Sequence, residues 1–161
     1  NSGNPFIGIN VSGRWGNLKD WNTNQAAKNH NGIGGFDNLN NRGYLSFEYW
    51  GTPSIINGKI SQTHTLPKGK YNFVSTISNI DFELENTYQV VFLGKELPDV
   101  NNVNQSKAFY KLTNNSLNER DVSVRFQLEN NQEVTLGFLS TMLNNNPTSI
   151  RISKVKLFIE E

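Results

Sequence analysis

The sequence contains no cysteine, and this absence removes several classes of chemistry. Disulfide bonds, thiolate metal sites and a cysteine nucleophile all require a thiol in the chain. The absence fits a cytosolic protein, and it fits equally a bacterial secreted protein that folds without disulfides. The function must therefore be sought in other residue types.

The chain also lacks a long apolar run and an excess of either charge. Val90–Leu93 is among the longest apolar stretches, far short of the ~18 residues that a membrane-spanning helix needs. The 15 Lys and Arg residues are balanced by 14 Asp and Glu residues, and the basic residues form no run. Nucleic acids and anionic membranes attract proteins through basic patches, so we predict neither partner and no membrane span within this chain.

The 161 residues are enough to bury a sizeable core, and we expect residues 1–161 to form a single domain. Residues 1–14 are either a linker or the first strand. Asparagine accounts for about one residue in six, well above average usage. An AT-rich genome explains such a bias, and so does a surface rich in loops that hydrogen-bond to polar ligands.

Alternation of apolar and polar residues predicts that the chain is built from β-strands. The clearest alternation runs through residues 122–128, and Tyr44–Trp50 shows the same pattern. In the last strand, Ser149–Glu160, the alternation changes phase near Ser153–Lys154, as a β-bulge would make it do. About eight or nine strands and no convincing helix indicate an all-β, antiparallel sandwich or barrel.

The stretch Gly58–Ile77 predicts a hairpin, with two strands joined by a tight turn at Pro67–Gly69. Proline sets φ for the turn, and Gly69 supplies a backbone conformation that residues with a Cβ resist. His64 shares a strand face with apolar residues, so we expect a buried, hydrogen-bonded histidine in preference to a catalytic one. A second hairpin is predicted around Asn130–Asn131.

No catalytic constellation stands out in the sequence. Asp81, Glu83 and Glu85 would share one face of a strand, and paired carboxylates hydrolyse glycosides. Jelly-roll glycosidases carry a similar trio in the order Glu, Asp, Glu, which differs from the order here. A solvated strand edge is the favoured role, and a glycosidase is a distant alternative. Because Gly-x-Ser-x-Gly and phosphate-binding glycine motifs are also missing, we predict that the protein is not an enzyme.

The sequence contains no complete metal-binding motif. His30 and His64 have no third ligand at a spacing suited to zinc. Asp37–Gly43 resembles a calcium loop, but Leu39 occupies a ligand position and the glycine comes one residue late. We therefore predict no cofactor, although a structural calcium ion held elsewhere by backbone carbonyls and a carboxylate is compatible with the sequence.

The first third of the chain combines aromatic residues with hydrogen-bonding side chains. Tryptophan and tyrosine present flat apolar faces with a polar edge, which suits stacking against a sugar ring. Two roles fit Trp15 and Trp21 equally well. They either stack against a sugar or fill the ends of the sandwich. Trp50 falls out of phase with the core-facing residues, which favours a ligand. The predicted ligand-binding residues are Trp15, Trp21, Trp50, Tyr44, Arg42 and Glu48.

Two stretches resemble galactose-binding-like jelly rolls. In ISQTHTLPKGKYNF, a strand with a glutamine leads into Leu-Pro-x-Gly-x-Tyr, and SIRISKVKLF is similar to the closing strand of those modules. WGNLKDWNTN, Gln62–Phe73, GKELPDV and VTLGFLS, in this order, resemble a domain of unknown function at the C-terminal end of surface lipoproteins of Bacteroidetes-type gut bacteria. This resemblance covers most of the chain from about Trp15 onward.

The resemblance implies a galactose-binding-like jelly-roll sandwich that serves as a non-catalytic, carbohydrate-binding module. It also implies an extracellular or cell-surface location, as a fragment of an outer-membrane lipoprotein with other domains. The family offers no catalytic residues to carry over. A structural or protein-interaction domain of a larger surface protein is the alternative, and it predicts buried tryptophans and no aromatic-lined cleft.

Overall fold

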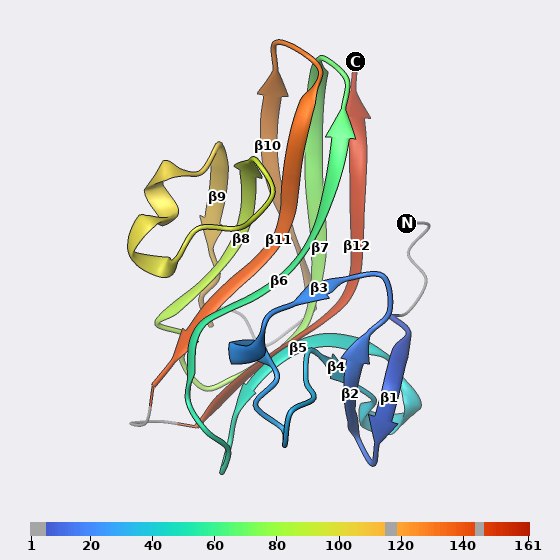
Figure 1. The fold of residues 1–161 in the computed structure, drawn as a ribbon, viewed down its shortest axis with the longest axis vertical. Helices are drawn as coiled ribbons and strands as arrows, with labels where there is room; N and C mark the ends of the chain where they lie inside the picture. Colours follow the sequence, from blue (N-terminus) through green and yellow to red (C-terminus); the bar gives the residue numbers. More distant parts are fainter. Residues whose placement is uncertain (1–5, 115–118, 144–146) are drawn as a thin grey trace.

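The computed structural model describes residues 6–114, 119–143 and 147–161, which form a β-sandwich of two antiparallel sheets (Figure 1). The all-β fold predicted from the sequence is confirmed, although the described residues contain twelve strands instead of eight or nine. In spatial order, the seven-stranded sheet contains β1 (Gly8–Ser12), β2 (Trp15–Leu18), β4 (Phe36–Asp37), β5 (Tyr44–Tyr49), β12 (Thr148–Glu160), β7 (Gly69–Asp81) and β10 (Arg120–Leu128).

The second sheet has five strands and faces the first across the core (Figure 1). In spatial order, it contains β3 (Asn22–Thr23), β6 (Ile55–Leu66), β11 (Gln132–Met142), β8 (Asn86–Leu93) and β9 (Ala108–Lys111). The connections include the 3-10 helices η1 (Gln25–Ala27), η2 (Leu39–Asn41) and η3 (Val100–Gln105). No helix among the described residues is long and apolar enough to cross a membrane.

The core is built from the inward faces of the strands. On β10, alternate residues from Val122 to Leu128 are buried and those between them are exposed, as the alternation predicted. β8 is buried on both faces because η3 and its flanking segment cover its outer side. A second, smaller apolar cluster forms there from Tyr88, Val90, Leu97 and Leu139.

The two predicted hairpins are wrong, because each pair of strands is divided between the two sheets. β6 pairs with β3 and β11, whereas β7 pairs with β10 and β12. β10 and β11 are likewise in different sheets. Both turns are therefore crossovers, and they touch where the backbone N–H of Lys68 donates to the side-chain carbonyl of Asn131 at 3.0 Å. Alternation cannot distinguish the two cases, because strands in one sheet and in facing sheets both bury one face.

The role predicted for Gly69 is also wrong. Gly69 does not have a positive φ, and a Cβ placed there would lie 3.5 Å from the nearest atom of Tyr71. The turn is closed by side-chain chemistry instead: the hydroxyl of Tyr71 donates to the carbonyl of Pro67 at 2.7 Å. An alanine could therefore occupy this position without strain.

The predicted bulge is confirmed, and the predicted acidic strand is not. Between β12 and β7 the register shifts twice: Ser78 is the extra residue on β7 between Arg151 and Ile152, and Ser153 is the extra residue on β12 between Ile152 and Lys154. Asp81, however, is the last residue of β7, and Phe82–Glu85 form an irregular turn before β8. The three carboxylates therefore do not share a strand face.

Two strands leave part of an edge unpaired within the described residues. β12 pairs with β5 only over Thr148–Ile152, and beyond that point only with β7. β6 pairs with β3 only at Ile60 and Ser61. The later part of β6 and the C-terminal part of β12 thus border an open side of the sandwich (Figure 1).

Candidate functional site

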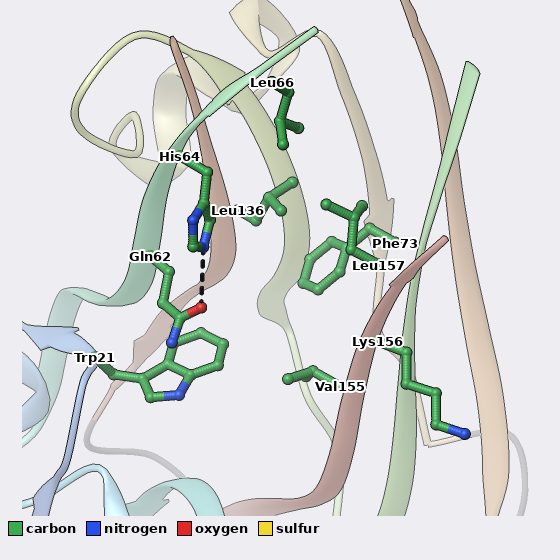
Figure 2. Close-up of a pocket in the computed structure, with 9 residues that line it drawn as sticks. All are labelled: Trp21, Gln62, His64, Leu66, Phe73, Leu136, Val155, Lys156 and Leu157. Atoms are coloured by element: carbon green, nitrogen blue, oxygen red, sulfur yellow. Dashed lines mark hydrogen bonds between the residues drawn. The ribbon is translucent and has the colours of Figure 1, made fainter. Parts of the chain in front are cut away.

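A cleft of about 220 Å³ opens between the free edges of β6 and β12 (Figure 2). Its floor is apolar because the inward faces of four strands reach it at this open side. These floor residues are Leu66, Phe73, Leu136, Val155 and Leu157. Trp21 forms one wall, and its indole is held edge-on by Phe6, with ring centroids 5.7 Å apart. The sequence thus places an indole beside an apolar floor, in which Leu66 and Leu157 are half-buried and the other three residues are buried.

Polar groups line the wall on β6. The side-chain amide of Gln62 donates to the backbone carbonyl of Asp20 at 2.9 Å, and its oxygen lies 3.1 Å from Nε2 of His64 (Figure 2). Because both ends of the amide are engaged, Gln62 is held in one orientation. His64 is exposed, so the buried histidine that we predicted is wrong. The inward face of β6 meets the open cleft at this point and not the packed core.

The chemistry of the cleft is that of a binding site. An indole face, an oriented amide and an imidazole surround an apolar floor, and this combination suits a ligand with both an apolar face and hydroxyl groups. The lining includes Lys156, whose ammonium group points away from the other labelled side chains (Figure 2). None of the nine lining residues is a carboxylate, so the cleft lacks the acid pair that glycoside hydrolysis uses.

Of the six predicted ligand-binding residues, Trp21 alone lines this cleft. Trp50 is 50% exposed and lies beside Phe82 at the end of β5. Arg42 and Tyr44 line a separate hollow of about 270 Å³, in which Arg42 is exposed and Tyr44 is buried. The structure therefore does not bring the six residues together, and their role as ligand contacts remains a prediction.

Trp15 and Glu48 belong to a group of side chains on the outward face of the seven-stranded sheet. We call this group the Arg14 cluster, and it consists of Arg14, Trp15, His30, Asp37 and Glu48. Nε and Nη2 of Arg14 donate to the two oxygens of Asp37 at 2.6 and 2.7 Å, and Nη2 also reaches Glu48 at 3.4 Å. The guanidinium carbon lies 4.7 Å from the centre of the Trp15 ring. Arg14, Asp37 and Glu48 satisfy one another, which indicates a structural role, whereas Nε2 of His30 is buried without a hydrogen-bond partner among the described residues.

Burial sets the protonation behaviour of this cluster. It lowers the pKa of His30 to about 4, although Asp37 acts in the opposite direction. Burial also raises the pKa of Glu48, against the attraction of Arg14. The hydrogen bond to Asp37 raises the pKa of Arg14, so the guanidinium stays charged. The cluster thus holds one fixed cation against two carboxylates.

Sequence reasoning missed Gln62, His64 and Leu157 as parts of the cleft. The first two were placed on one strand face with apolar residues, which was a usable signal. Leu157, however, comes from a strand more than ninety residues later in the chain than Gln62. No local pattern indicates that these strands border the same opening.

Residues 1–137 match a protein family described as a domain of unknown function, DUF5013. The chain belongs to the DUF5013 family. A comparison of this DUF5013 domain with curated proteins gives no match.

Several solved structures are similar to the DUF5013 domain. A structure titled "CBM4 structure and function" has a TM-score of 0.56 at 9% identity, with 88% of this chain and 95% of that chain covered. TmCBM61 in complex with β-1,4-galactotriose has a TM-score of 0.45 at 11% identity, with 88% and 83% covered. The K3 cleaved adhesin domain of Lys-gingipain from Porphyromonas gingivalis W83 has a TM-score of 0.49 at 12% identity, with 86% and 91% covered. The first likeness supports the β-sandwich fold, whereas the other two scores are too low to support a conclusion.

Proposed function

We propose that this DUF5013 domain is a non-catalytic module that binds carbohydrate, and that the cleft between β6 and β12 holds the sugar. The observation that carries the proposal is the position of the Trp21 indole beside the oriented amide of Gln62, above an apolar floor. A pyranose ring has apolar C–H faces and a rim of hydroxyl groups. The cleft offers a partner for each of these two parts.

Hydrogen bonding to the sugar would use groups that are already positioned. The amide nitrogen of Gln62 carries two protons, of which the carbonyl of Asp20 takes one. His64 contacts Gln62 through Nε2. Within the part of the chain that the structure describes, its Nδ1 is available to a hydroxyl group of the ligand. A preformed donor loses little conformational entropy when the ligand binds, which supports a binding role for this wall.

The same proposal places the module outside the cell, as part of a larger surface protein with other domains. Polysaccharides are ligands that a protein meets at the cell surface, and the motif order described above is similar to that of a surface-lipoprotein domain. The sequence has 15 Lys and Arg residues against 14 Asp and Glu residues, whereas nucleic acids attract proteins that carry an excess of basic residues. The proposed partner is therefore a glycan.

Calorimetric titration against plant and host oligosaccharides tests the proposal. We expect one glycan class to bind, and Trp21→Ala and Gln62→Ala each to weaken that binding at least tenfold, a loss of about 1.4 kcal/mol. Gln127→Ala is the matched control, because Gln127 is an exposed amide on β10. Binding that survives both cleft substitutions would exclude the cleft. The absence of any glycan ligand would exclude the function.

A protein-interaction domain is the second candidate, and one observation favours it. The free edge of β12 carries Phe158 and Ile159, which are 46% and 71% exposed. An unpaired edge with exposed apolar residues can accept a strand from another protein. Oligomerisation in light scattering that Ile159→Lys abolishes would support this candidate, whereas saturable sugar binding by the monomer would count against it.

A further inference from the structure

The turn between β7 and β8 exposes an aromatic pair at a distance from the cleft. Phe82 is 58% exposed and Trp50 is 50% exposed, and their ring centroids lie 5.5 Å apart. The turn follows Asp81, which is eight residues further along β7 than Phe73 of the cleft floor. At 3.3 Å per residue this is about 25 Å, so the pair is separate from the cleft.

The backbone of Phe82 is strained. Its φ is +64°, in the left-handed region that glycine and asparagine adopt readily and that bulky residues avoid. Such a conformation persists only where its surroundings hold it. Because the ring of Phe82 is mostly exposed, burial of apolar surface does not offset this backbone strain. Packing therefore does not explain why phenylalanine occupies this position.

Hydrogen bonds hold the turn on both sides of Phe82. The side-chain amide of Asn114 donates to the Phe82 carbonyl at 2.7 Å, and the hydroxyl of Thr148 donates to the Asp81 carbonyl at 3.0 Å. The carboxylate of Asp81 accepts from Ser149 at 2.9 Å. Several hydrogen bonds thus fix a turn in which one apolar ring is exposed to solvent.

The surroundings of the pair indicate its ligand. The two ring planes meet at 47°, so they form an angled surface. Such a surface fits a single polymer chain and not the flat surface of many packed chains. Phe82 borders a shallow hollow of about 410 Å³ together with Glu83, Asn114 and Pro147. The exposed Glu83 places negative charge beside the rings, which disfavours an acidic ligand, whereas the carboxylate of Asp81 is paired with Arg151 at 3.4 Å.

We propose that Trp50 and Phe82 form a second carbohydrate-binding surface, which stacks against one chain of a neutral polysaccharide. The inference takes its ligand class from the proposed function, but it stands on residues that do not line the cleft. Amide and carboxylate groups of Asn114 and Glu83 lie where they can meet the hydroxyl groups of a stacked sugar.

Affinity electrophoresis through gels that contain soluble arabinoxylan, galactan or polygalacturonan tests this surface. Trp50→Ala and Phe82→Gly should each weaken retardation by a neutral polysaccharide at least fivefold. Any retardation by polygalacturonan, which is acidic, should be the same in the wild type and in these two variants. Phe109→Ala, which removes a 42% exposed phenylalanine on β9, is the matched control and should have no effect.

Thermal unfolding of the Phe82 variants separates binding from packing. Glycine relieves the left-handed strain, so the Tm of Phe82→Gly should stay equal or rise by about 2–4 °C while retardation is lost. Phe82→Asn, which also tolerates this φ, should behave in the same way. A lower Tm with unchanged retardation would make Phe82 a packing residue and overturn the inference.

The pattern across variants distinguishes the two proposals. Loss of binding in Trp21→Ala alone would support the cleft as the sugar-binding site and exclude the aromatic pair. Loss of binding in Trp50→Ala and Phe82→Gly alone would support the aromatic pair as the binding surface and exclude the cleft. A wild-type protein that no neutral polysaccharide retards would exclude the aromatic pair, whatever the calorimetry of small glycans shows for the cleft.

Discussion

The imidazole of His30 lies flat against the indole of Trp15, with ring centroids 3.6 Å apart and ring planes within 9° of parallel. Burial lowers the pKa of this imidazole from 6.5 to about 4. The unfolded chain therefore takes up a proton near pH 6.5, and the folded chain does so only near pH 4. The contribution of His30 to the free energy of unfolding is therefore largest above pH 6.5 and is lost as the pH drops from 6.5 to 4.

We expect His30→Phe to reduce this pH dependence. Phenylalanine keeps an aromatic ring against Trp15 but cannot be protonated, so its urea midpoint should fall less than that of the wild type between pH 7 and pH 4. Glu48, whose pKa is raised by burial, changes stability in the opposite sense and is present in both proteins. The control is His64→Gln, which removes the other histidine of the sequence, an exposed residue outside the Arg14 cluster. An unchanged slope in His30→Phe would contradict the prediction.

Gly137 should tolerate no side chain. A Cβ at this position would lie 2.1 Å from the carbonyl oxygen of Ile60 and 2.8 Å from the Cα of Ser61, so β6 and β11 would have to move apart. We expect Gly137→Ala to lower the free energy of unfolding by about 1–3 kcal/mol or more, measured by chemical denaturation. Gly69→Ala, where a Cβ has room, should be neutral or stabilise by about 0.4–1 kcal/mol. Equal effects of the two substitutions would argue against this difference.

Gln89 connects the two sheets through the core. Its side chain is fully buried on β8, accepts a hydrogen bond from Ser75 and donates to the backbone carbonyl of Phe73 at 2.9 Å. Gln89→Leu would leave these partners buried and unpaired, which should lower the free energy of unfolding by about 1–3 kcal/mol. The double variant Gln89→Leu, Ser75→Ala should recover part of that loss. A double variant less stable than the sum of the single changes would contradict this explanation.

The ion pair of Arg14 should matter more than an exposed pair of the same type. The carboxylate of Asp37 is fully buried, so Arg14→Ala leaves it without its cation and should cost about 2–3 kcal/mol, a value reduced by the 35% exposure of Arg14. Arg125→Ala, which breaks an exposed pair with Glu160, should cost less than about 1 kcal/mol. Urea denaturation of both variants checks the comparison, and a similar cost in each would show that Asp37 is rescued by other groups.

Much of the fold follows from local alternation. The alternate residues of Val122–Leu128 indicated the buried face of β10, and the phase change near Ser153 indicated the bulge of β12. The pairing of strands did not follow, because a turn such as Pro67–Gly69 can lead back into one sheet or across to the other. That choice depends on which distant strand offers a partner edge.

Less of the candidate site was accessible from the sequence. Trp21 was among the predicted ligand-binding residues, and it borders the cleft because of its contact with Phe6. Phe82 was not singled out, because nothing in a sequence shows that a residue adopts a positive φ when it is neither glycine nor asparagine. Both sites depend on segments that approach one another only in the folded chain.

The change in pairing along β12 has a kinetic consequence. From Thr148 to Ile152 the strand lies between β5 and β7, and beyond the bulge it has β7 on one side only. Amide hydrogens in the first part should therefore exchange with deuterium slowly, as expected for an interior strand. Beyond Ser153, the amides that face β7 should stay slow and those that face the free edge should exchange faster, so that protection of both sides of the strand ends at the bulge.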